Sequence, residues 1–146
     1  MLIYDIAHFL HTFSLALWFG GLFGYVLIVW PSIIETEQPG FPRAQLSSIA
    51  LRTAPWIYLA MITALVTAVV YFFGSLHRIS FEAKLLYMMI LVLLIANNVY
   101  GSVISWPRMM LSPNDVAKTS WKWFYLRMAI SLLGGLLLLC IAIFAT

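Results

Sequence analysis

Residues 8–31 of the chain, HFLHTFSLALWFGGLFGYVLIVWP, decide its fold. The stretch is longer than the about 20 apolar residues that a helix needs to cross the hydrocarbon core of a bilayer. It begins with two histidines, His8 and His11, and it closes with Trp30 and Pro31. Because an ionisable side chain inside an apolar span is costly, the histidines mark a candidate functional site.

The composition of the whole chain is that of an integral membrane protein. Of its 146 residues, 64% are hydrophobic and 9% are charged, whereas a soluble domain is roughly half apolar and about a quarter charged. No polar stretch is longer than a loop, so we expect residues 1–146 to form a single transmembrane domain. The net charge of +3 is small and scattered. It does not indicate a nucleic-acid partner, and the expected surroundings are a lipid bilayer.

Three further stretches are long and apolar enough to cross a membrane. With the first, they predict four transmembrane helices at about residues 6–30, 54–76, 84–106 and 124–145. None of these runs alternates polar and apolar residues as a membrane strand does, and all are too long for strands. The predicted fold is therefore all-α, an integral membrane four-helix bundle.

Basic residues gather in the first and third linkers, which lie on one side of a four-span bundle: Arg43, Arg52, Arg108, Lys118 and Lys122. The opposite side holds only Arg78 and Lys84. Cytoplasmic loops carry an excess of Lys and Arg, so both termini are predicted on the periplasmic side. Five tryptophans are expected in an aromatic belt at the cytoplasmic interface: Trp30, Trp56, Trp106, Trp121 and Trp123.

The chain also carries a faint internal repeat. The end of the first span, YVLIVWPS at residues 25–32, is similar to YGSVISWPR at residues 100–108. Two helical hairpins of the same topology would form a pseudo-twofold bundle.

Candidate chemistry gathers at the outer ends of the predicted helices. His8 and His11 lie in the first turns of span one, His77 ends span two, and Lys84 opens span three. Imidazole is the commonest transition-metal ligand in proteins and holds haem iron in many of them. For His8 and His77, hydrogen bonding to headgroups or to a neighbouring backbone is the alternative. Lys84 either acts in catalysis as a proton donor or acceptor, pairs with a propionate or binds iron, or snorkels outward.

His11, Trp18, Leu22 and Tyr25 share one helical face, since steps of 7, 11 and 14 residues return to nearly the same angle. That face forms either a wall for a flat cofactor or an ordinary helix contact. Glycines are expected at close helix contacts, or beside a bound ring: Gly20, Gly21, Gly24, Gly134 and Gly135. Asn97 and Asn98, in the middle of span three, are expected in interhelical hydrogen bonds or in contact with a ligand.

The segment LHTFSLALWFGGLFGYVLIVWPSI resembles the first-helix pattern of the copper-resistance D (CopD) family. The pattern is a histidine, a tryptophan seven residues later, two glycines, and an apolar run closed by proline; the matching residues are His11, Trp18, Gly20, Gly21 and Pro31. The stretch FEAKLLYMMILVLLIANN resembles the lysine-led helix of the same group, with Lys84 in the lysine position. The related HemJ family of haem-binding, four-helix protoporphyrinogen oxidases is similar in its histidine-to-tryptophan spacing and in its helix-opening lysine.

This resemblance implies haem b bound near the periplasmic side of a bacterial inner membrane, with His11 as an axial ligand. His8 and His11 diverge by about 60° on one helix, so the trans ligand is expected from another helix. His8, His77 or Lys84 would supply the sixth ligand or a propionate contact.

The expected function is electron transfer or HemJ-like porphyrinogen oxidation, with a quinone or another respiratory-chain component as partner. Two alternatives stay open. The first is CopD-like copper uptake, with His8, His11, Met88 and Met89 as ligands, because imidazoles and thioethers suit Cu(I). The second is a small accessory subunit of a respiratory membrane complex, without a cofactor. Association into a homo-oligomer is also left open.

Overall fold

The computed structural model of the chain describes residues 2–35, 40–74 and 79–144. Within them, four helical runs are long and apolar enough to cross a membrane, as the sequence predicts. The first run contains α1 (Leu2–Gly24), the π-helical turn η1 (Tyr25–Val29) and α2 (Trp30–Ile34), and the second is α3 (Arg43–Gly74). The third contains α4 (Phe81–Tyr100), the π-helical turn η2 (Gly101–Ser105) and α5 (Trp106–Leu111), and the fourth is α6 (Asn114–Phe144).

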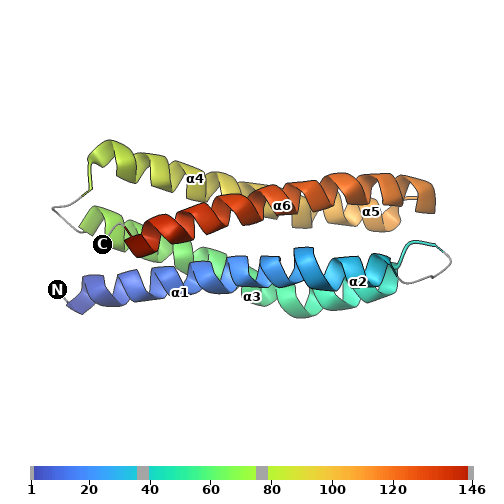
Figure 1. Cartoon of the computed structure of the whole chain (residues 1–146), viewed down its shortest axis with the longest axis horizontal. Coiled ribbons are helices and arrows are strands. Elements are labelled where there is room, and N and C mark those ends of the chain that lie inside the picture. The colour runs from blue at the N-terminus through green and yellow to red at the C-terminus, as the bar shows by residue number, and fades with distance from the viewer. Residues whose placement is uncertain (1, 36–39, 75–78, 145–146) are drawn as a thin grey trace.

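The runs lie side by side in one elongated bundle (Figure 1). α1 packs along α3, and α6 contacts both α1 and α4. The start of α1, the end of α3, the start of α4 and the end of α6 lie at one end of the bundle (Figure 1). We call this the terminal end and the opposite end the linker end. The two termini share a side, as the predicted topology requires.

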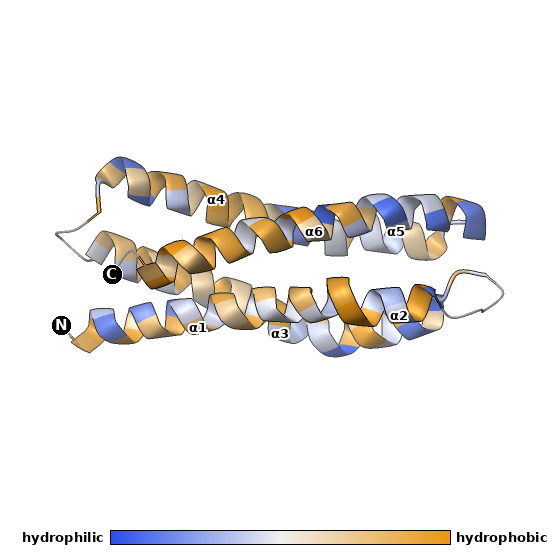
Figure 2. Cartoon of the chain, viewed as in Figure 1, coloured by the Kyte–Doolittle hydropathy of each residue, from blue (hydrophilic) through white to orange (hydrophobic). Residues whose placement is uncertain are grey.

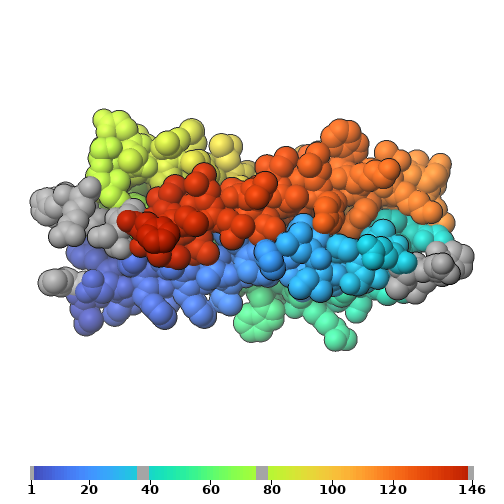
Figure 3. Space-filling view, viewed as in Figure 1, coloured from blue at the N-terminus to red at the C-terminus, as the bar shows by residue number. Residues whose placement is uncertain are grey.

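The outer surface of the bundle is apolar along its length. Hydrophobic residues cover the helices, while hydrophilic ones are concentrated toward the linker end of α5 and α6 (Figure 2). Large side chains such as Phe9, Leu59 and Leu133 are more than half exposed. Figure 3 shows α1 and α6 side by side on one such face. A surface of this kind matches lipid and not water.

The helices extend beyond the spans predicted from hydropathy. The polar segment before span two continues the helix, so α3 begins at Arg43 and not near residue 54. α6 likewise begins at Asn114 and not at residue 124. Hydropathy marks only the part of a helix that lies in hydrocarbon, whereas a helix can continue into the interface.

Both π-helical turns stand directly before a Trp-Pro pair. In η1 the Trp30 N–H donates to the Tyr25 carbonyl, and in η2 the Trp106 N–H donates to the Gly101 carbonyl. A proline ring clashes with the carbonyl four residues before it and supplies no N–H. The wider turn accommodates the ring, and the helix continues past it. The two copies of the internal repeat therefore share a backbone distortion as well as a sequence.

Two glycines on α6 allow close helix packing. A Cβ atom on Gly135 would lie 2.0 Å from the ring of Phe19 on α1, and one on Gly134 would lie 2.9 Å from Leu94 on α4. Phe19 is completely buried at this crossing. The predicted role of these two glycines in helix contact is confirmed.

The same prediction is wrong for the glycines of α1. The described residues place no atom within 4 Å of a Cβ built on Gly20, Gly21 or Gly24. α1 turns the opposite side, with Trp18 and Leu22, toward the core.

The tryptophans divide between core and surface. Trp30 and Trp121 are only 8% exposed, and their rings meet edge to face with centroids 5.4 Å apart. Phe124 packs against both. Trp56 and Trp123 are 72% and 70% exposed, as residues of an aromatic belt would be. The prediction of five interfacial tryptophans is thus wrong for Trp30 and Trp121, because stacking at the linker end of the core buries them.

One arginine joins the two halves of the bundle at the linker end. Arg43, the first residue of α3, donates from Nε to the Met110 carbonyl at 2.9 Å. Its guanidinium also donates to the Ser112 carbonyl and to the Asn114 side chain. These bonds connect α3 to the turn between α5 and α6.

We predict that Gly135→Ala lowers the midpoint of thermal unfolding in detergent, because the added methyl overlaps the buried Phe19 ring. Overpacking of this kind costs about 1–3 kcal/mol. Gly21→Ala is the matched control, since it meets no atom and removes a helix-destabilising glycine. Equal midpoints for the two variants, measured by circular dichroism, would contradict the described packing of α6 on α1.

Candidate functional site

His11 is fully buried between α1, α3 and α4. Its Nδ1 lies 2.8 Å from the Ala64 carbonyl oxygen, and its Nε2 lies 2.7 Å from the Tyr87 hydroxyl. A carbonyl can only accept, so Nδ1 carries the proton and Nε2 accepts from Tyr87. The Phe72 ring stands edge-on to the imidazole at 6.0 Å. Both nitrogens of the imidazole are therefore hydrogen-bonded inside the protein.

His8 lies about one turn nearer to the terminal end and takes part in separate contacts. Its Nε2 is 3.0 Å from the Ala142 carbonyl of α6, and its ring stacks on Tyr71 of α3 at 4.6 Å. The structure thus places His8 and His11 toward different neighbours, as their angular separation predicts. A hydrogen bond to neighbouring backbone, the alternative weighed for His8, is present.

The other predicted residues of this end are not drawn into one cluster. Lys84 is partly buried in the first turn of α4, one turn before Tyr87, and Glu82 is exposed. His77 lies outside the described residues. Among the described residues, no three His, Cys, Asp or Glu side chains gather into a metal-binding group.

The structure allows a direct test of whether haem fits at His11. The donor chemistry is suitable, because iron-binding histidines commonly donate their other ring N–H to a backbone carbonyl. The available space is not suitable. The Tyr87 hydroxyl is hydrogen-bonded to Nε2, the nitrogen that would bind iron, and the imidazole has no exposed surface. As packed, these residues do not fit an intervening macrocycle. Ligation would require α1 and α4 to separate and Tyr87 to leave.

Two buried polar atoms of α1 lack partners among the described residues. They are the indole Nε1 of Trp18 and the hydroxyl of Thr12, both on α1. Trp18 is fully buried and stacks on Phe19 at 4.3 Å. A buried donor without a partner costs about 1–3 kcal/mol.

The residues predicted to bind copper are not brought together either. Met88 is partly buried against the core, whereas the neighbouring Met89 is 54% exposed. Adjacent residues on a helix point about 100° apart, so the two thioethers do not converge with the histidines of α1. Three other methionines, Met61, Met110 and Met128, line a pocket at the opposite end of the bundle.

This pocket is an apolar cavity of about 770 Å³ between α3, α5, α6 and the η1 region. Two residues of the predicted cofactor wall, Leu22 and Tyr25, line it, while His11 and Trp18 do not. His11 precedes Leu22 by eleven residues, or about 16 Å of helix. Two of the four residues of the predicted face therefore border a cavity, and this cavity lies away from His11.

The pocket walls combine aromatic and aliphatic side chains with a few neutral polar groups. Trp30, Trp106 and Phe124 supply ring surfaces. The Tyr58 hydroxyl is hydrogen-bonded to the Ser102 hydroxyl on one wall, and Asn98 lies one turn before Ser102. None of the described residues that line the pocket carries a charge. The site thus suits a neutral, largely apolar guest with hydrogen-bonding groups at one position.

Backbone irregularities surround the same pocket. Tyr25 opens η1, Ser102 belongs to η2, and Pro55 interrupts the hydrogen bonding of α3, and all three residues line the cavity. Backbone distortion at membrane depth is tolerated where it is buried in protein or lines a cavity. π-helical turns are also frequent at functional sites.

The asparagine pair of α4 serves interhelical hydrogen bonding. Asn97 Nδ2 donates to the Ser131 hydroxyl at 2.6 Å, and Asn98 Nδ2 donates to the Leu94 carbonyl at 2.9 Å. Asn98 Nδ2 also lies 3.3 Å from the Ser131 hydroxyl. The hydrogen bonds across to α6 bear out the first alternative, and Asn98 in addition borders the pocket.

Comparisons with protein families, with curated proteins and with solved structures find no match to this chain.

The pocket was missed at the sequence level, although signals for it were present. Two Trp-Pro pairs and Pro55 place three helix distortions on the linker side of the spans. Tyr58 and Ser102 lie at corresponding depths of neighbouring helices, but neither stands out among apolar residues until the helices are paired. The histidines stand out in the sequence because they are ionisable, but they lie toward the terminal end of the bundle, away from the pocket.

We predict that Tyr87→Phe lowers the midpoint of thermal unfolding, because it leaves buried His11 Nε2 without a donor. The expected cost is about 1–3 kcal/mol. Tyr4→Phe, at a residue 39% exposed, is the control and should have little effect. Combining Tyr87→Phe with His11→Leu should recover part of the loss, since both ends of the bond are then apolar. An additive double variant would argue against the His11–Tyr87 bond.

Proposed function

We propose that this chain is a multi-pass membrane protein that binds a molecule of the isoprenoid quinone class, as a small subunit of a respiratory membrane complex. The observation that carries the proposal is the uncharged 770 Å³ pocket, whose polar lining residues include the group formed by Tyr58, Ser102 and Asn98. Ligand pockets are commonly about 300–1,000 Å³, with apolar walls and a few placed polar groups.

The chemistry of the walls favours a quinone over other membrane amphiphiles. A fatty acid or phospholipid head carries charge and would need a charged partner in an apolar site. A quinone head is neutral, and a carbonyl oxygen of the head can accept a hydrogen bond from the Tyr58 hydroxyl when this group turns from Ser102, whose own hydroxyl donates to the Asn98 carbonyl. Its flat ring suits the aromatic faces of Trp30 and Trp106. The methionines adapt to an irregular isoprenoid tail.

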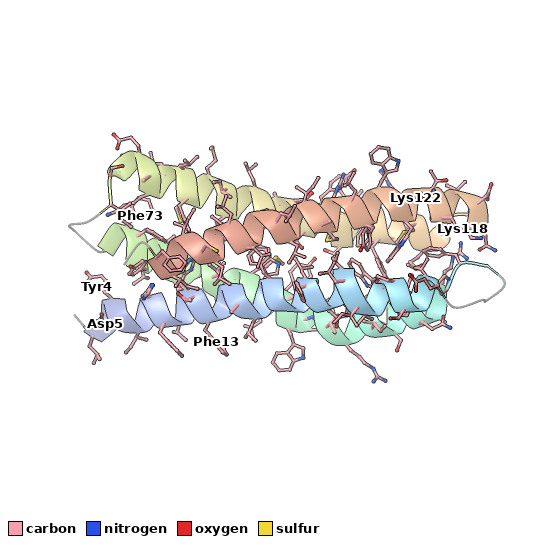
Figure 4. The ribbon with its side chains drawn as sticks, in the orientation of Figure 1. Tyr4, Asp5, Phe13, Phe73, Lys118 and Lys122 are labelled. Atoms are coloured by element: carbon pink, nitrogen blue, oxygen red, sulfur yellow. The ribbon has the colours of Figure 1, made fainter. Side chains whose placement is uncertain are left out.

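The expected topology supports this placement. Basic residues such as Lys118 and Lys122 lie at the linker end, opposite Tyr4 and Asp5 near the start of the chain (Figure 4). The positive-inside rule then places the pocket in the cytoplasmic half of a bacterial inner membrane and both termini in the periplasm. The quinone would enter from the inner leaflet. Lys84 lies fourteen residues from Asn98, about 21 Å along the helix, and takes no part in this site.

A second candidate function is the binding of haem b by His11, in electron transfer or porphyrinogen oxidation, in a packing that differs from the described one, whose residues do not fit the group. The orphaned Trp18 Nε1 and Thr12 hydroxyl favour it, since they offer buried donors on the same helix as His11. The carbonyl of Ala64 also sets the tautomer that leaves Nε2 as the donor to a metal. This candidate requires the side chain of Tyr87 to move away from Nε2.

For the quinone pocket, we predict that decylubiquinone quenches tryptophan fluorescence saturably in the purified protein, because Trp30 and Trp106 line the cavity. Ala50→Phe fills part of the pocket and should raise the dissociation constant at least tenfold. Ala44→Phe is the matched control, since Ala44 is exposed on α3 and does not line the cavity. Equal affinities for the two variants, or no saturable quenching, would remove the proposal.

For the haem candidate, the prediction is a reduced-minus-oxidised spectrum with Soret and alpha bands after expression with added haem precursor. His11→Ala should abolish these bands, whereas His8→Ala should keep them, because His8 contacts other partners. A flat spectrum from the unaltered, folded protein rules this candidate out without affecting the quinone pocket.

A further inference from the structure

A groove of about 640 Å³ runs between α4 and α6 on the outer surface, away from the quinone pocket. Its walls are aliphatic and face the surrounding lipid: Leu93 is 61% exposed and Ile130 is 58% exposed. Two polar residues interrupt these walls, Asn97 on α4 and Arg127 on α6. A cation in an otherwise apolar groove is costly unless an anion accompanies it.

The guanidinium of Arg127 is held against α4. Its Cζ lies 4.3 Å from the centre of the Tyr100 ring, and Nη1 makes a long hydrogen bond of 3.4 Å to the Ser105 hydroxyl. No carboxylate is among the described residues that line the groove. The guanidinium has five N–H donors, so these contacts leave capacity for an oxyanion.

We expect Arg127 near the depth of a lipid phosphate group, from its distance along α6 to residues typical of the membrane interface. Lys122 and the exposed Trp123 mark the interface on the same helix, and Lys122 lies at the linker end (Figure 4). Arg127 follows Lys122 by five residues, or about 7.5 Å of helix. The polar headgroup region of one leaflet is about 5–8 Å thick, so the arginine lies at its lower edge.

We propose that this groove binds an anionic phospholipid, with the phosphate at Arg127 and an acyl chain along Leu93 and Ile130. The charge favours an anionic over a zwitterionic lipid. A phosphatidylcholine headgroup brings its own ammonium, for which the described groove offers no carboxylate. The cytoplasmic leaflet is rich in anionic lipids, and Lys122 on the same helix adds to the attraction for them.

The test is native mass spectrometry of the detergent-purified protein with added phosphatidylglycerol or phosphatidylcholine of the same acyl chains. The unaltered protein should retain phosphatidylglycerol at several-fold lower lipid concentration than phosphatidylcholine. Arg127→Gln should remove this preference. Arg108→Gln removes the same charge from an exposed position at the same end and should keep it.

A second variant protects the test against a folding defect in Arg127→Gln. Ile130→Trp leaves the arginine in place and obstructs the groove, and it should also weaken phosphatidylglycerol retention. Inorganic phosphate at millimolar concentration should not displace the lipid, because the acyl chain contributes to binding. Equal retention of the two lipids, an equal loss in Arg108→Gln, or no effect of Ile130→Trp would each overturn the proposal.

Discussion

This structure depends on one constraint: backbone N–H and carbonyl groups inside hydrocarbon must be hydrogen-bonded to other protein groups. An N–H or carbonyl facing lipid without a partner costs several kcal/mol, so a membrane helix cannot simply stop at a proline. In this chain Pro31 and Pro107 each follow a π-helical turn, and the helix continues to Ile34 and to Leu111. Widened turns displace side chains from regular packing. The cavity lies where the two displaced segments and Pro55 of α3 meet.

A polar side chain in an apolar span also needs hydrogen-bond partners inside the protein, and the buried histidine is an example. His11 is costly in an apolar span, and the bundle satisfies it with the Ala64 carbonyl and the Tyr87 hydroxyl. These bonds join α1 to both α3 and α4. A buried polar network of this kind fixes how neighbouring helices are rotated, which apolar contacts in lipid specify poorly. The histidine thus has a structural role whether or not it also binds a cofactor.

Much of the fold could be predicted from the sequence, but the site could be predicted only in part. Hydropathy identified four helices because each is apolar over a length sufficient to cross a membrane, and it does not mark the more polar helical turns before Trp56 and Trp123. The shared face of Trp18 and Leu22 followed from helical angles alone. Which cavity that face borders depends on how η1 and η2 turn their side chains, and a period of 3.6 residues does not describe a π-helical turn. The outward direction of Gly20 likewise depends on which side of α1 meets α3.

The contact of Arg43 with the turn after α5 has a consequence for exchange of any guest. The pocket lies between α3 and α5, and Arg43, one turn before the lining residue Ser47, joins these helices through bonds to the Met110 and Ser112 carbonyls. Hydrogen bonds from a charged group are stronger than neutral ones, so the Arg43 bonds oppose separation of α3 from α5. Any movement of α3 away from α5 therefore requires these bonds to break first.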